Sequence, residues 1–198
     1  MIKRAAVLLC LGIAACSPTS ESIELRYQRW LEAGHGSQVA TYDAYLHAQG
    51  VAGVLPLQGL LRSGRRWRLC GDEFALPPRA DWGSIKPTLQ LVADLQASGI
   101  LKDVEVASGW RSAAFNRCEG GSSRSRHLTN NALDFDVRAG IDTTRLCAYW
   151  RTHGAARKFG LGFYSRTQIH VDTSGFRTWG HDYHRATSLC TPGLPARG

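Results

Sequence analysis

The feature that most constrains the fold is a pair of short segments in which apolar and polar side chains alternate. Residues 132–137 read Ala-Leu-Asp-Phe-Asp-Val, and residues 168–173 read Gln-Ile-His-Val-Asp-Thr. A period of two is typical of a β-strand with one buried face. The polar members on the other face are Asp134 and Asp136 of the first segment and His170 and Asp172 of the second. The sequence therefore predicts a sheet with one apolar face and one face that carries ionisable groups.

Helices are expected around these strands, because apolar residues recur at spacings of three and four. The expected helices are residues 22–33, 37–49, 88–97, 113–118 and 143–158. The first two are expected to form a hairpin against the main body. Further strands are expected at 104–108, at 65–69 as an edge strand, and at 162–164 as the hairpin partner of 168–173. Together they predict an α+β fold in which helices cover one side of a small antiparallel sheet.

The N-terminus has the features of an export signal. Lys3 and Arg4 precede an apolar run over residues 5–15 that is too short to span a bilayer. The run ends Ile-Ala-Ala-Cys, which resembles a bacterial lipobox with Cys16 as the lipidated residue. An ordinary secretory signal cut near Ala15 is the alternative. In a Gram-negative envelope the serine after Cys16 indicates the periplasmic face of the outer membrane.

This interpretation divides the chain into four parts. They are a leader at 1–16, a tether at 17–22, a helical hairpin with an edge segment at 23–70, and a core at 71–198. With 24 basic and 16 acidic residues the net charge is +8, and losing Lys3 and Arg4 lowers it by two. An exported basic protein rarely meets nucleic acid. Its expected partners are the anionic cell wall and, through the lipid anchor, the membrane.

Four cysteines remain after the leader and Cys16 are set aside. They are Cys70, Cys118, Cys147 and Cys190. In an oxidising compartment they predict two disulfides, although the sequence does not choose among the three possible pairings. A four-cysteine zinc site is the alternative, and the absence of short ligand spacings argues against it.

The candidate chemistry lies in His127, Asp134 and His170. Two imidazoles and one carboxylate can hold a catalytic zinc ion and leave a fourth position for water. His127 lies in a polar loop seven residues before Asp134, and His170 comes from a different strand. His181 and His184 also lie three residues apart, but in a polar region they are expected to be surface residues.

The surrounding motifs resemble a known family. They are Ser108-Gly109-Trp110-Arg111-Ser112, Asn116, Gly120-Gly121, Ser125, His127, Ala132, Asp134, Gly160–Tyr164, Ile169–Thr173, Arg177 and Trp179. In order and spacing they are similar to the zinc D-Ala-D-Ala carboxypeptidases and murein endopeptidases of the M15 class. The resemblance spans about half of the chain and implies the hedgehog/D-Ala-D-Ala peptidase fold. It also implies one Zn²⁺ ion bound by His127, Asp134 and His170.

The resemblance further implies that Arg111 grips a carboxylate of a peptidoglycan stem peptide. A guanidinium matches a carboxylate through two parallel hydrogen bonds, although a structural salt bridge is the alternative. Ser125 is expected to add a hydrogen bond to that carboxylate or to cap the loop. The expected function is hydrolysis of stem-peptide bonds, as a D-Ala-D-Ala carboxypeptidase or a cross-link endopeptidase. The alternatives are a non-catalytic zinc-containing wall-binding lipoprotein and an interaction domain with structural zinc.

Two residues depart from the family pattern. Asn130 stands where a glycine is common, and asparagine tolerates the left-handed backbone that such a turn needs. Many members carry an acidic residue shortly before the second histidine, whereas residues 165–169 contain none. Asp172, and next Asp136, are therefore the candidates for the catalytic base. Either could instead orient a ligand histidine.

Overall fold

The fold is built on a five-stranded sheet with the strand order β1-β2-β4-β3-β5. The computed structural model describes residues 21–138 and 140–191, so the predicted leader, Cys16 and most of the tether lie outside the described residues. The strands are β1 (Val104–Ser108), β2 (Ala132–Val137), β3 (Gly160–Phe163), β4 (Gln168–Asp172) and β5 (Arg177–Trp179). The pairs β1–β2, β2–β4 and β3–β4 are antiparallel, whereas β5 runs parallel to β3. The sequence did not predict this parallel edge strand.

The register of the sheet places the polar residues of β2 and β4 side by side. Asp134 lies directly opposite His170, and Leu133 lies opposite Val171. Because side chains alternate along a strand, Asp134 and His170 share one face while Leu133 and Val171 share the other. The predicted division into an apolar face and an ionisable face is confirmed.

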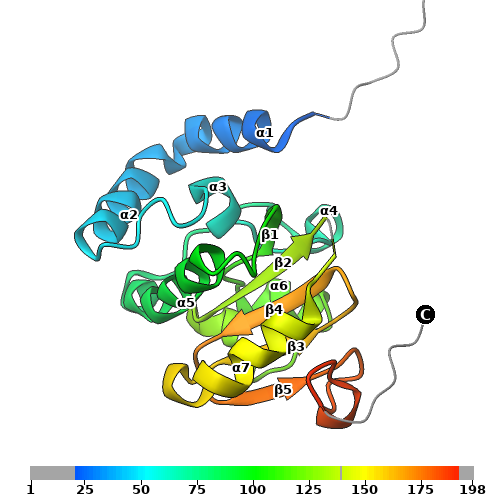
Figure 1. Cartoon of the computed structure of the whole chain (residues 1–198). Helices are drawn as coiled ribbons and strands as arrows, with labels where there is room; N and C mark the ends of the chain where they lie inside the picture. The colour runs from blue at the N-terminus through cyan, green and yellow to red at the C-terminus, as the bar shows by residue number, and fades with distance from the viewer. Residues whose placement is uncertain (1–20, 139, 192–198) are drawn as a thin grey trace, which may run out of the picture.

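The apolar face of the sheet packs against two long helices. They are α5 (Lys86–Ala97), which follows a 3₁₀ turn η2 (Arg79–Ile85), and α7 (Thr143–Arg157). Leu89, Leu95 and Leu146 of these helices are fully buried in one core with Leu133 and Phe135 of β2. Figure 1 shows α5 and α7 lying across the near side of the sheet. The fold is therefore α+β, as predicted.

Five short helical elements complete the fold in the described residues. They are α3 (Leu57–Leu60), α4 (Trp67–Cys70), α6 (Ala113–Cys118), the 3₁₀ turn η3 (Arg126–Thr129) and the 3₁₀ turn η4 (Arg185–Thr187). Helix α6 begins at Ser112, whose hydroxyl accepts a hydrogen bond from the Phe115 amide at 3.1 Å. The expected edge strand at 65–69 is wrong, because residues 67–70 form α4 instead.

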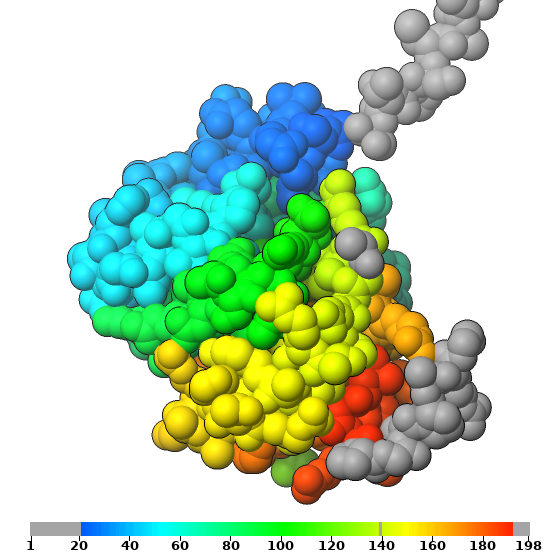
Figure 2. Space-filling model, in the orientation of Figure 1, coloured from blue at the N-terminus to red at the C-terminus, as the bar shows by residue number. Residues whose placement is uncertain are grey.

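The N-terminal helices form a bent arc rather than the expected hairpin. Helix α1 (Ile23–Trp30) continues through a π segment, η1 (Leu31–His35), into α2 (Gly36–Ala48). Gly34 bends this run with a φ of 111°, a conformation that favours glycine. Figure 2 shows the blue and cyan segment lying along the main body, where Tyr42 of α2 packs against Trp82. None of the helices in the described ranges is long and apolar enough to cross a membrane.

Two disulfides join distant parts of the core. Cys70 pairs with Cys118, which ties α4 to α6, and Cys147 pairs with Cys190, which ties the C-terminal segment to α7. The prediction of two disulfides is confirmed, and the structure supplies the pairing that the sequence left open. The alternative four-cysteine zinc site is excluded, because the cysteines are bonded to each other.

Candidate metal centre

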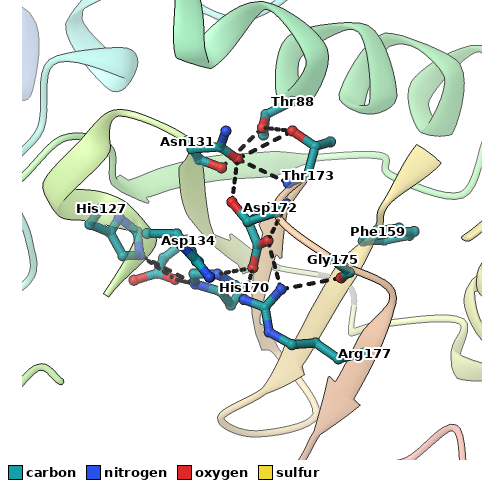
Figure 3. Close-up of polar contacts among 12 residues, drawn as sticks. Thr88, His127, Asn131, Asp134, Phe159, His170, Asp172, Thr173, Gly175 and Arg177 are labelled. Atoms are coloured by element: carbon teal, nitrogen blue, oxygen red, sulfur yellow. Dashed lines mark hydrogen bonds and ion pairs between the residues drawn. The ribbon is translucent and has the colours of Figure 1, made fainter. Parts of the chain in front are cut away.

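Three predicted ligands converge on one point at the polar face of the sheet. His127 comes from η3, Asp134 from β2 and His170 from β4. Asp134 Oδ1 lies 2.9 Å from His170 Nδ1 and 3.2 Å from His127 Nε2, and the two histidine nitrogens are 3.2 Å apart. All three side chains are buried. Figure 3 shows them pointing toward one another.

The backbone around Gly109 fixes the ring of His127. The Nδ1–H group of His127 donates to the Gly109 carbonyl at 2.6 Å, which leaves Nε2 with its lone pair toward the other ligands. Gly109 also packs tightly against the preceding chain, since a Cβ there would lie 2.2 Å from the Leu60 carbonyl oxygen. Because Gly109 has no side chain, the backbone after β1 can pass close to Leu60. This close approach places the Gly109 carbonyl where it orients the His127 ring.

Asp172 orients the second histidine from the opposite side of its ring. His170 Nε2–H donates to Asp172 Oδ2 at 2.9 Å. This hydrogen bond leaves the lone pair of His170 Nδ1 for binding a metal. The Arg177 guanidinium in turn holds both oxygens of Asp172, at 2.6 and 3.0 Å. Figure 3 shows Asp172 between His170 and Arg177. Of its two predicted roles, this geometry favours orientation of His170, because Asp172 is fully buried and bonds the nitrogen away from the ligand cluster.

Arg111 orients the carboxylate ligand in a similar way. Its Nη2 donates to Asp134 Oδ2 at 2.7 Å, and its Nε donates to the Ser108 hydroxyl at 2.8 Å. Glu119 lies 3.4 Å from the same guanidinium. The structural salt bridge, which was the alternative to a substrate grip, is therefore present. It holds Oδ2 and leaves Oδ1 to face the histidines.

The electrostatics of the cluster depend on burial and on mutual contact. Burial raises the pKa of Asp134, but the charges and hydrogen bonds of the two histidines outweigh it and hold that pKa well below its usual value. Burial lowers the pKa of His127, and it remains the dominant effect there. For His170 the hydrogen bonds that its ring makes to the Asp134 and Asp172 carboxylates outweigh burial and raise the pKa. The cluster therefore holds an ionised Asp134 beside a neutral His127, whereas the raised pKa of His170 favours its protonated form, and a metal bound there would displace that proton.

Zinc matches this donor set. Bonds of about 2.0–2.1 Å in tetrahedral geometry place neighbouring donors roughly 3.3 Å apart. The three donor–donor distances of 2.9, 3.2 and 3.2 Å lie close to that value. Each ligand also has an outer partner that holds it in place, as protein metal sites usually do. His127, Asp134 and His170 would hold the metal, and three protein ligands leave a fourth position open.

His127 and His170 line a cleft of about 580 Å³, and Asp134 is buried behind them. The aromatic lining of the cleft consists of Trp150, Tyr164, Phe176, Trp179 and Tyr183, and its basic lining consists of Arg111, Arg124, Arg126, Arg177 and Arg185. Within the part of the chain that the structure describes, no aspartate or glutamate lines this cleft. A cleft of this composition favours an extended ligand that carries negative charge.

The remaining predicted residues lie around this cleft. Ser125 lines it and makes no capping hydrogen bond from its side chain, so the loop-cap alternative is not observed. Asp136 lies outside the cleft lining and forms an ion pair with Arg65 at 2.6 Å. Asn130 has a φ of 52° and a ψ of 41°, so it adopts the left-handed conformation predicted for it. His184 is exposed, as expected of a surface residue.

Sequence reasoning missed Tyr164 as a site residue. Its hydroxyl lies 3.3 Å from Asp134 Oδ1 and 3.5 Å from His170 Nδ1. Burial and the charge of Asp134 raise its pKa well above the usual value, so the phenol stays protonated at neutral pH. The signal available in the sequence was its place just before the turn that leads to the strand of His170.

The fold and the site define a metallopeptidase-like protein with a His-Asp-His centre in a basic cleft. A family model described as Peptidase M15 matches residues 68–172, which contain all three ligands. The chain therefore belongs to the peptidase M15 family. Members of this family are typically zinc-dependent, in agreement with the donor set. A comparison with curated proteins finds no match.

Proposed function

We propose that the protein is a zinc-dependent metallopeptidase that hydrolyses peptide bonds in peptidoglycan stem peptides, as a D-Ala-D-Ala carboxypeptidase or a cross-link endopeptidase. The observation that carries the proposal is the convergence of His127, Asp134 and His170 in a cleft lined by arginines. Stem peptides carry several carboxylates, which complement that lining. Membership of the peptidase M15 family supports the reaction class.

The side chains around the metal divide the work between holding ligands and binding substrate. When bound, zinc polarises the scissile carbonyl and lowers the pKa of its water toward about 7. Arg111 and Asp172 each fix a ligand in the required orientation. Arg124, Arg126 and Arg185 are exposed in the cleft and form no side-chain ion pair with any described residue. We assign the substrate carboxylates to these three side chains, with Ser125 beside them.

The proposed setting is the cell envelope. The lipobox-like segment ending at Cys16 supports export and lipid anchoring on the periplasmic face of the outer membrane. The two disulfides support it independently, since structural disulfides persist in oxidising compartments.

A non-catalytic wall-binding protein is the second candidate. The observation that favours it is the cleft lining, in which the described residues supply no carboxylate to accept the proton of the attacking water. Such a protein would bind the same anionic peptides and leave them intact.

The test is digestion of purified muropeptides by the soluble protein, loaded with zinc or treated with chelator, and analysed by mass spectrometry. Release of D-alanine identifies a carboxypeptidase, and conversion of dimers to monomers identifies an endopeptidase. Both activities should disappear with chelator and return with zinc. Intact muropeptides that nevertheless co-sediment with the zinc-loaded protein would support the second candidate and reject the enzyme.

A further inference from the structure

The hydroxyl of Tyr164 lies within 3.5 Å of ligand atoms of both Asp134 and His170. Tyr164 follows β3 directly, and its backbone amide donates to the Gln168 carbonyl at 3.0 Å, so the turn that begins β4 fixes its position. Its side chain lines the cleft, and its ring lies edge-on to the His170 ring with centroids 6.4 Å apart. The tyrosine therefore faces the same space that a substrate must enter to reach the metal.

The hydroxyl lies where a reacting group would be within its reach. Its distances of 3.3 Å to Asp134 Oδ1 and 3.5 Å to His170 Nδ1 are close to the roughly 3.3 Å that separates neighbouring donors around tetrahedral zinc. The hydroxyl therefore lies beside the ligand atoms of two of the three ligands. A substrate oxygen drawn to a metal held by these atoms would lie near the Tyr164 hydroxyl.

The hydrogen bond that Tyr164 makes in the structure is a weak one. A distance of 3.3 Å exceeds the usual 2.5–3.0 Å of an O–H···O bond. Asp134 Oδ1 also contacts both histidines, so it is a poorer hydrogen-bond acceptor for the phenol. The phenol O–H can therefore turn to a better acceptor at small cost.

The other polar groups of the cleft are less suited to this task. The guanidinium of Arg111 is already bound to Asp134 and Ser108. Arg177 is bound to Asp172 through both terminal nitrogens. Arg124 and Arg126 are exposed side chains that can bind carboxylates away from the centre. The indole N–H of Trp179 is buried in the same cleft but forms no hydrogen bond to any described residue. The Tyr164 hydroxyl, in contrast, lies beside two ligand atoms.

We propose that Tyr164 is a catalytic residue whose hydroxyl donates a hydrogen bond to the scissile carbonyl oxygen as negative charge develops on it. This role rests on the proposed peptidase function. It is electrostatic: no bond to Tyr164 forms or breaks, and the phenol keeps its proton throughout. Donors aimed at a developing oxyanion stabilise the transition state more than the ground state.

The position of Tyr164 allows two other roles, and each predicts a different effect of losing its hydroxyl. A tyrosine that only positions Asp134 would act through metal affinity, because its loss would loosen a ligand. A tyrosine that ligates the metal would also change that affinity. A donor to the substrate oxygen would change turnover and leave zinc binding unaltered.

The test compares Tyr164→Phe with Tyr149→Phe, which removes a phenol from α7 outside the cleft. Zinc affinity is measured by competition with a chelating dye. The affinity of the zinc-loaded protein for acetohydroxamate is measured by calorimetry, because that probe presents a carbonyl oxygen to the metal without requiring any particular peptide. kcat and KM are measured on muropeptides.

For Tyr164→Phe we expect kcat to fall about 100-fold, the usual effect of removing one oxyanion donor. Acetohydroxamate should bind about tenfold more weakly, and zinc affinity and KM should match those of Tyr149→Phe. An unchanged kcat with unchanged hydroxamate affinity would overturn the proposal. Weaker zinc binding, with activity restored by excess zinc, would also overturn it and assign a positioning role. Wild-type protein that cleaves no muropeptide would reject the proposed function, while the hydroxamate comparison would still test Tyr164.

Discussion

Substitution of Asp172 by asparagine separates the two roles predicted for this residue. Asp172 accepts a hydrogen bond from His170 Nε2 at 2.9 Å and is held by Arg177 at 2.6 and 3.0 Å. Asparagine has nearly the same shape, and its carbonyl oxygen can still face His170. It lacks the negative charge that strengthens the histidine as a ligand and that pairs with Arg177.

The expected loss of zinc affinity follows from the contact of Asp172 with the ligand His170. Loss of such an outer partner lowers metal affinity by about 10- to 100-fold, which corresponds to roughly 1.4–2.8 kcal/mol. The lost contact with Arg177 adds little, because the Arg177 side chain is 39% exposed and its charge can be solvated by water. Once the site is saturated with zinc, the variant should turn over at close to the wild-type kcat.

The assay is a chelator competition for zinc affinity, followed by muropeptide kinetics at saturating zinc. Asp43→Asn is the matched control, since it removes a carboxylate from the exposed surface of α2. The reasoning would be refuted if Asp172→Asn bound zinc as tightly as the control while kcat fell by about 10²–10⁴-fold. That result would make Asp172 the base.

Three further predictions concern the cleft arginines, the Asp134 carboxylate and the second disulfide. Arg124→Gln combined with Arg126→Gln should raise KM on muropeptides about tenfold with little change in kcat, and an unchanged KM would contradict their role in binding carboxylates. For the metal-free protein, the folded-state pKa of Asp134 lies below its unfolded value, so its stabilising contribution is present above that value and is lost as pH falls. Urea midpoints should therefore fall as pH drops below about 4, and they should fall less in Asp134→Asn. Replacing Cys147 and Cys190 by alanine opens a 43-residue link and should lower the free energy of unfolding by about 4 kcal/mol, and a variant as stable as the parent would refute this.

The polar face of the sheet could be predicted because its signal is local. Alternation along two strands determines which side chains share a face, whatever the strands pair with. The ligand set His127, Asp134 and His170 followed from that face and from a motif resemblance, and the structure brings the three together. Asn130 was likewise predictable, because the left-handed conformation depends on one residue.

The rest of the site depends on contacts between distant segments. Nothing in the sequence states that the Arg111 guanidinium meets Asp134, 23 residues away, before it can meet a substrate. Asp172 contacts Nε2 of His170 and not Nδ1. Which nitrogen it contacts depends on the side-chain rotamer of His170, and strand alternation does not determine that rotamer. Residues 67–70 form a helix whose Cys70 is bonded to Cys118 of α6, a contact between distant segments that the local alternation of residues 65–69 does not show. The three-residue strand β5 is too short to show a period.

The most direct test of the account is the position and number of bound zinc ions. Protein purified without chelator should carry one zinc ion per chain by elemental analysis. Anomalous diffraction at the zinc edge should show one peak within bonding distance of His127 Nε2, Asp134 Oδ1 and His170 Nδ1. Protein that binds no zinc, or a peak bound by other residues, would contradict the metal centre and the proposed chemistry with it.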